Sequence, residues 1–121
     1  MKKRQSIILI LIAAGAILFS CSPAEKEDLL FFYFESCPSC DNYKLAEEYN
    51  EIILLLNKGK DWNAAHYNLI TPESAAELKK ILEEKGLPDI SRSLPLLITG
   101  NEYINGYEAI GEKLEQLKKD A

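Results

Sequence analysis

The fold of this 121-residue chain depends on one stretch: Leu29-Leu30-Phe31-Phe32-Tyr33-Phe34-Glu35-Ser36-Cys37-Pro38-Ser39-Cys40. Its first six residues are all apolar and rich in aromatics, and the run is too short for an ordinary helix. These features predict a strand buried on both faces of a sheet. After the break at residues 35–38, apolar residues recur at helical spacing up to Lys58-Gly59. We therefore expect a central strand that leads through two cysteines into a helix.

The rest of the chain predicts five further elements. They are a strand over 62–70, a helix from Thr71-Pro72 to Gly86, a hairpin with strands 94–99 and 102–105 around Gly100-Asn101, and a helix from about Tyr107. A helical crossover makes the first two strands parallel, whereas the hairpin adds antiparallel strands. We expect an α/β fold: a small mixed sheet, in the order strand-helix-strand-helix-hairpin-helix, with helices on both faces.

Residues 1–20 have the layout of an export signal. A basic head, Met1–Arg4, precedes an uninterrupted run of apolar and small residues, Ile7–Phe19, and the small residue Ser20 follows. The run is shorter than the roughly 20 residues that span a bilayer, which favours a cleaved signal. An uncleaved anchor is the alternative.

The charge balance excludes some classes of function. The chain carries 14 Lys and Arg against 19 Asp and Glu, a net charge of −5, and this acidic surplus argues against nucleic-acid binding. Cleavage of the signal would remove three basic residues, Lys2, Lys3 and Arg4, and leave a net charge of −8. A domain with this charge should be soluble, and anionic headgroups should repel it, so we expect it to stand off the membrane. Residues 22–28 are polar and predict a short tether.

The three cysteines cannot all pair with one another, so they are expected to differ in role. Leu18-Phe19-Ser20-Cys21 resembles the lipobox of bacterial lipoproteins, although Phe19 is bulkier than the usual residue there. The resemblance implies diacylglycerol on the Cys21 thiol, cleavage before Cys21 and N-acylation, with fatty acids such as palmitate holding the protein on the extracytoplasmic side of the cell membrane. A free thiol is the alternative for Cys21.

Cys37 and Cys40 have the spacing of a reactive pair. At a helix start they can close a small disulfide with little backbone movement. The free amides and positive dipole end of the helix stabilise a thiolate, so we expect Cys37 to have a lowered pKa and to be the attacking nucleophile. Cys40 is expected to be more shielded and to resolve mixed disulfides, and Pro38 is expected in the first helical turn.

Other uses of the pair fit the sequence less well. A metal site needs further ligands, and His66, the only histidine, is distant in the sequence. Haem attachment needs a histidine where the chain has Asp41. A purely structural disulfide gains little from so short a loop. We therefore expect redox chemistry without a metal, in which the Cys37–Cys40 disulfide takes the place of a cofactor.

From Leu29 onward the chain resembles the thioredoxin superfamily, which includes the glutaredoxin-like domains. The resemblance is carried by the strand that feeds Cys37-Pro38-Ser39-Cys40, by the order of elements, by Leu94-Pro95 before the penultimate strand and by Gly106. It implies that Pro95 is a cis-proline opposite the cysteine pair. It also implies that the Leu94 backbone pairs with a substrate peptide as an added strand, with Pro38 and Ser39 contributing to the binding surface.

The chain departs from the family at several positions. Ser36 replaces a tryptophan that many thioredoxins have, and Phe31 occupies the position of a buried acid that helps move the proton of the resolving thiol. Glu35 is the nearest upstream carboxylate; it either acts through water or is a solvated turn residue. Glu35 and Asp41 also place negative charge beside the thiols, which opposes thiolate formation. The direction of the redox reaction therefore stays open.

These features together predict an enzyme: a lipid-anchored, extracytoplasmic thiol–disulfide oxidoreductase. Its domains would be a signal peptide (1–20), the lipidated Cys21 with a tether (21–28) and a thioredoxin-like domain (29–121). It would act as a monomer on thiols and disulfides of exported proteins and exchange electrons with a membrane partner. The alternative is a non-enzymatic module that holds a partner protein or Cu(I) on the thiol pair.

Overall fold

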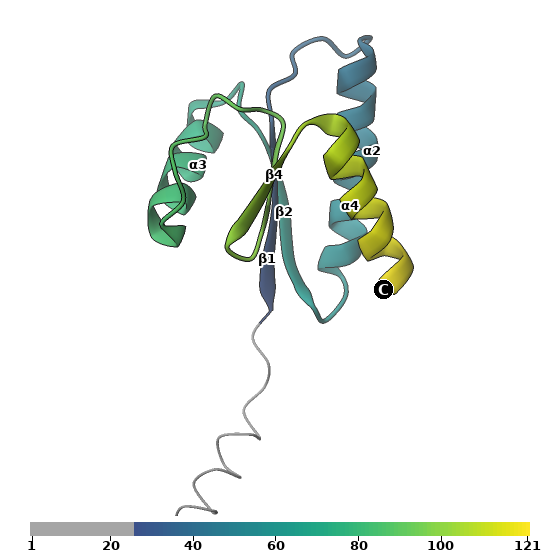
Figure 1. Cartoon of the computed structure of the whole chain (residues 1–121). Helices are drawn as coiled ribbons and strands as arrows, with labels where there is room; N and C mark the ends of the chain where they lie inside the picture. Colours follow the sequence, from purple (N-terminus) through teal and green to yellow (C-terminus); the bar gives the residue numbers. More distant parts are fainter. Residues whose placement is uncertain (1–25) are drawn as a thin grey trace, which may run out of the picture.

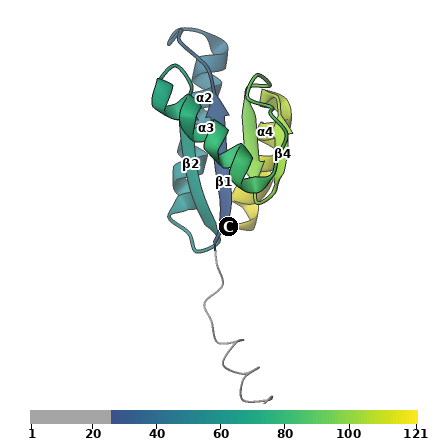
Figure 2. The ribbon, with the colours of Figure 1, turned by 90° about the vertical axis from the view of Figure 1, so that its left-hand side faces the viewer.

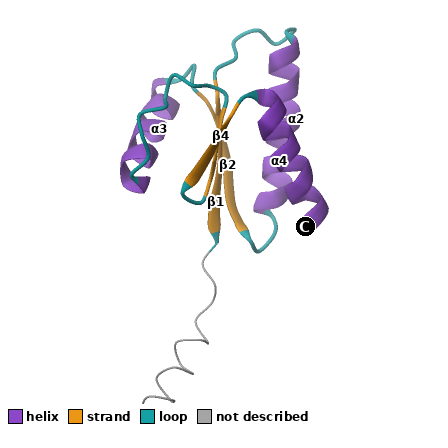
Figure 3. Cartoon of the chain, in the orientation of Figure 1, coloured by secondary structure: helices purple, strands orange, loops and turns teal. Residues whose placement is uncertain are grey.

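The structure is a computed structural model that describes residues 26–121; the predicted signal peptide, Cys21 and most of the tether lie outside the described residues. Seven elements follow one another in the predicted order (Figure 3). They are β1 (Glu27–Tyr33), α2 (Asp41–Asn57), β2 (Trp62–Asn68), α3 (Pro72–Lys85), β3 (Leu96–Thr99), β4 (Glu102–Asn105) and α4 (Tyr107–Asp120).

The four strands form one mixed sheet in the order β2-β1-β3-β4. β1 runs parallel to β2, with Tyr33 opposite Asn68, and antiparallel to β3, with Phe32 opposite Leu96. The hairpin pairs β3 with β4. The prediction of a central first strand, parallel to the second, is confirmed.

Helices cover both faces of the sheet, as predicted: α2 and α4 lie on one face and α3 on the other (Figures 1 and 2). Side chains of β1 alternate between these faces. Leu29, Phe31 and Tyr33 pack with residues of α2 and α4, whereas Leu30 and Phe32 pack with α3. A strand buried on both sides needs apolar residues at every position, which explains the unbroken apolar run. The predicted fold class, a small mixed α/β sheet of the thioredoxin-like kind, is confirmed.

The boundaries of β1 differ from the prediction. The strand begins at Glu27, because the ladder with β2 continues through Glu27 and Asp28, so the tether is shorter than predicted. At the other end the strand stops at Tyr33, and Phe34 is 56% exposed. The Lys85 ammonium forms an ion pair with the Asp28 carboxylate at 2.9 Å, which connects the start of β1 to the end of α3.

The ends of the other elements agree more closely with the prediction. Thr71 caps α3 by accepting a hydrogen bond from the Ser74 amide, and Gly86 ends the helix with a φ of 66°. β2 stops at Asn68, two residues before the predicted end, because the chain turns there toward α3. Within residues 26–121 no helix combines the length and the apolar character that a membrane span requires.

Candidate functional site: a disulfide turn at the sheet edge

Several elements meet at one edge of the sheet. β1 and β2 are parallel and both end there, while β3 runs the opposite way and begins there. Because Leu96 pairs with Asn105, β4 ends at the same edge, and α4 starts two residues later at Tyr107. The loop after β1 therefore brings Cys37 and Cys40 to the edge where Pro95 and the start of α4 also lie.

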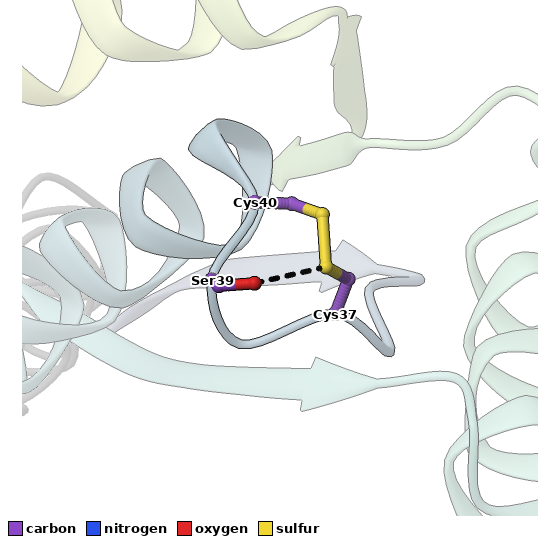
Figure 4. Close-up of a disulfide and its surroundings, with 3 residues drawn as sticks. All are labelled: Cys37, Ser39 and Cys40. Carbon is purple, nitrogen blue, oxygen red and sulfur yellow. Dashed lines mark hydrogen bonds between the residues drawn. A yellow bond between two sulfur atoms is a disulfide. The ribbon is translucent and has the colours of Figure 1, made fainter.

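Cys37 and Cys40 form a disulfide, with an S–S distance of 2.11 Å and a Cα–Cα distance of 5.4 Å (Figure 4). Pro38 and Ser39 form the turn between them, and the Cys40 amide donates to the Cys37 carbonyl oxygen at 3.0 Å. Proline suits the second position of such a turn because its φ is already restricted. The prediction that Pro38 lies in the first helical turn is therefore wrong: the turn precedes the helix.

The two cysteines also lie differently from the prediction relative to the helix. α2 begins at Asp41, and Cys40 is its N-cap residue, with extended backbone (φ −83°, ψ 150°). Cys40 is exposed and Cys37 only partly so, which is the reverse of the predicted shielding. The reason is that Cys40 ends the turn outside the first helical turn instead of lying inside it. No side chain caps α2, so the first-turn amides have no side-chain acceptor.

Ser39 gives the Cys37 sulfur a polar neighbour. The Ser39 hydroxyl oxygen lies 3.6 Å from Cys37 Sγ, within hydrogen-bond range for sulfur (Figure 4). After reduction this hydroxyl can donate to a Cys37 thiolate, and a hydrogen bond to the charged form favours that form. Ser39 was predicted as part of the substrate-binding surface; the geometry adds a role next to the attacking sulfur.

Asn68 fixes the loop that carries the cysteines. Its side-chain nitrogen donates to the Glu35 carbonyl at 2.9 Å, and its Oδ1 accepts from the Glu35 amide at 3.3 Å. The same oxygen accepts from the Ile70 amide at 3.4 Å. One side chain at the end of β2 therefore holds the two loops that leave the parallel strands together.

Tyr107 holds the side chain of Glu35. Its hydroxyl donates to Glu35 Oε1 at 2.6 Å, across 72 residues of sequence. Burial, followed by the hydrogen bond and the nearby charge of Glu35, raises the pKa of Tyr107 well above its ordinary value. The Tyr107 carbonyl in turn accepts from the Tyr49 hydroxyl at 2.7 Å. Glu35 is therefore a fixed carboxylate beside the disulfide turn.

The Leu94–Pro95 peptide bond is cis, as the resemblance implies for this position. The Pro95 carbonyl accepts from the Gly106 amide at 3.1 Å, and the Asn105 side chain donates to the Ser93 carbonyl. Within residues 26–121 the Leu94 backbone has no backbone hydrogen-bond partner. Its amide and carbonyl can therefore pair with an added strand, the role that the resemblance implies.

Among residues 26–121 no buried carboxylate lies beneath this edge of the sheet. Phe31 is fully buried and stacks on Tyr33 with ring centroids 5.1 Å apart. Among residues 26–121 the one buried polar residue is Asn50, which is 5% exposed and donates to the Tyr33 hydroxyl at 3.0 Å. Burial raises the pKa of Tyr33, so this hydroxyl stays neutral at physiological pH. Two carboxylates therefore lie near the turn: Glu35, which Tyr107 holds, and Asp41 in the first turn of α2.

Asn68 and Tyr107 are the site residues that sequence reasoning missed. Asn68 has a local signal, because asparagine at a strand end commonly bonds to the backbone of a neighbouring turn. The sequence predicts Tyr107 only as the start of the last helix, and no local pattern distinguishes it from the other tyrosines. Its role depends on a contact that only the fold creates.

The metal alternative gains no ligands from the fold. Across the part of the chain that the structure describes, no group of three His, Cys, Asp or Glu side chains could hold a metal ion. His66 lies on β2 opposite Phe31, and burial lowers its pKa. Within residues 26–121 the ligands on offer to Cu(I) are the Cys37 and Cys40 sulfurs.

Comparison with known proteins identifies no relative: no family model, no curated protein and no solved structure matches the chain.

Proposed function

We propose that the protein is a thiol–disulfide oxidoreductase that uses the Cys37–Cys40 pair. The observation that carries the proposal is the disulfide itself, closed across a two-residue turn at the start of α2 and accessible from solvent. Exposed disulfides are the ones that exchange readily, whereas structural ones are usually protected. The fold supports the proposal by placing cis Pro95 and the unpaired Leu94 backbone at the same edge.

The exchange conserves atoms and electrons. In the reducing direction the Cys37 thiolate attacks one sulfur of a client disulfide, a mixed disulfide forms and the client releases a thiolate. The Cys40 thiolate then attacks Cys37 Sγ, which closes the Cys37–Cys40 disulfide and releases the second client thiolate. Two electrons pass from the pair to the client. In the oxidising direction the same steps run in reverse.

We assign the first attack to Cys37 because the Ser39 hydroxyl lies beside its sulfur. Cys40 has greater exposure and lies at the N-cap, and both features also favour a reactive thiol. The assignment therefore needs a direct test with both single variants.

The cellular part of the proposal follows from the first 21 residues. A protein with a signal peptide and a lipidated Cys21 would be anchored outside the cytoplasm, where disulfides persist. Its clients would be thiols and disulfides of exported proteins, and a membrane electron carrier would reset the pair.

Trapping of mixed disulfides tests this function. Cys40→Ser keeps the attacking thiol and removes the resolving one, so it should accumulate adducts with exported proteins that reductant releases. Cys37→Ser is the matched control, and a variant with both substitutions sets the background. Adducts in Cys40→Ser support the proposal with Cys37 as nucleophile. Adducts confined to Cys37→Ser would reverse the two roles, and background levels in both single variants would contradict the function.

A further inference from the structure

The end of the domain opposite the disulfide carries exposed apolar side chains. Leu54 and Leu55, in the last turn of α2, are each 51% exposed. Leu55 lines a groove of about 330 Å³ together with Trp62 and Leu117, where the ends of α2 and α4 meet the start of β2. We call this surface the basal face; it comprises Lys26, residues 54–62 and residues 117–121.

Several lysines share the basal face with these apolar side chains. The basal face holds five of the eleven basic residues in 26–121, all exposed: Lys26, Lys58, Lys60, Lys118 and Lys119. The acidic residues on it are Asp61 and Asp120, and Glu27 adjoins it. The basal face is therefore cationic by count, although residues 26–121 as a whole have 18 acidic side chains against 11 basic ones.

The chain also enters the domain at the basal face. The Lys26 ammonium donates to the Gly59 carbonyl at 3.4 Å, and the Glu27 amide donates to the Asp61 carbonyl at 3.2 Å. Figure 1 shows the start of β1, the α2–β2 connection and the end of α4 at the same end of the domain. Lys26 is five positions after Cys21, so a lipid on Cys21 would keep the basal face within about 18 Å of the bilayer surface.

We propose that the basal face binds an anionic lipid bilayer, with the lysines on phosphate headgroups and Leu54 and Leu55 inserted at the acyl boundary. Exposed leucines that share a face with several lysines are the combination that interfacial lipid binding requires. The negative net charge alone predicts that the domain stands off the membrane, whereas the uneven distribution of charge leads us to expect contact through the basal face. The disulfide turn, at the opposite end of β1, would then point away from the membrane.

Trp62 makes the binding measurable, because it is the only tryptophan of the chain and lines the groove in the basal face. The protein purified from membranes is reconstituted into vesicles of phosphatidylcholine with or without phosphatidylglycerol. Quenching of Trp62 fluorescence by brominated lipid then reports contact with the bilayer. We expect clear quenching in the anionic vesicles that high salt reduces by more than about half, and weak quenching in the neutral ones.

Matched variants separate binding at the basal face from tethering alone. Lys58→Glu with Lys60→Glu should abolish the difference between the two lipids, whereas Lys79→Glu with Lys80→Glu, the same charge change on exposed α3 positions, should preserve it. Leu54→Ser with Leu55→Ser should lose quenching, whereas Ile70→Ser, which is also 51% exposed but lies near the disulfide edge, should not. Far-UV circular dichroism checks the fold of each variant.

Absence of lipid quenching in the anionic vesicles, or equal quenching in all variants, would overturn the proposal. A Trp62 signal that changes with protein concentration but not with lipid charge would assign the basal face to a second copy of the chain, which also overturns it. The measurement involves no thiol exchange, so its result is independent of the redox function.

Discussion

Cys37 and Cys40 differ in what surrounds their sulfur atoms. Cys37 is partly buried and has the Ser39 hydroxyl 3.6 Å from its sulfur, whereas Cys40 is exposed at the N-cap of α2. Glu35, two residues before Cys37, is held by Tyr107 and cannot swing freely toward either sulfur. Reactivity at this site is therefore set by a few hydrogen bonds, each of which a single substitution can remove.

Ser39→Ala should slow the reaction of Cys37. Without the hydroxyl a Cys37 thiolate loses a hydrogen-bond donor, so its fraction at neutral pH falls and alkylation by iodoacetamide slows about three- to tenfold. The measurement is the pH dependence of alkylation of the reduced protein carrying Cys40→Ser. Ser36→Ala, an exposed serine on the same loop, is the control and should leave the rate unchanged. Equal rates for both variants would show that Ser39 does not act on Cys37.

Tyr107→Phe should loosen the loop that carries the disulfide. The substitution leaves a partly buried Glu35 carboxylate without its donor, so we expect a loss of about 1–2 kcal/mol in the free energy of unfolding, measured with urea. Tyr103→Phe, on an exposed side chain of β4, should cost much less. If the two variants lose equal stability, the Tyr107–Glu35 bond contributes nothing specific.

The helices and strands are held in register by contacts that their own patterns do not reveal. α2 and α4 approach closely where Gly111 faces Tyr49, whose hydroxyl also donates to the Tyr107 carbonyl. On the other face, Asp28 at the start of β1 forms an ion pair with Lys85 at the end of α3. Each contact joins elements that are distant in sequence, and each gives a prediction.

Gly111→Ala should destabilise the protein, although alanine is the better helix former. An added Cβ would overlap the Tyr49 hydroxyl, and relief of that overlap would break the bond to Tyr107. We expect a loss of about 1–3 kcal/mol by urea unfolding. Tyr49→Phe removes the overlapping oxygen, so the double variant should lose less than the sum of the two single ones. Strict additivity would contradict the assigned contact.

Asp28→Asn should weaken the protein at neutral pH and not in acid. The Lys85 ammonium holds the pKa of the Asp28 carboxyl below its ordinary value of 3.8. A lowered pKa in the folded state gives stability that is complete above pH 4 and lost as the pH falls through the folded value. The variant should therefore differ from wild type by no more than about 1 kcal/mol at pH 7, and the difference should shrink as the pH falls below 3.8. Asp61→Asn is the control; a constant difference at all pH values would contradict the ion pair.

At the scale of the whole molecule, the order of elements could be predicted because each one has a local signature. The apolar run at residues 29–34 needs two covered faces, Thr71-Pro72 and Gly86 mark the ends of a helix, and Gly100 marks a hairpin. The cysteine pair could be predicted from its spacing. The exposure of Cys40 could not, because it depends on whether the helix begins before or after the turn.

Long-range contacts are the part that no local pattern carries. Tyr107 bonds to the Glu35 carboxylate, 72 residues away along the chain, and Asn68 bonds to the Glu35 backbone, 33 residues away. The basal face likewise collects lysines from three separate segments, which a net charge cannot reveal. These features appear only when folding brings distant segments of the chain together.

The reduction potential of the Cys37–Cys40 pair tests the central claim most directly. The full chain is equilibrated in dithiothreitol and glutathione buffers of known potential, and its free thiols are counted by alkylation and mass. We expect one reversible two-electron transition, in which the ratio of thiol to disulfide changes tenfold per about 30 mV, with a midpoint between about −270 and −120 mV. A pair that stays oxidised below about −300 mV would be a structural disulfide and would contradict the account.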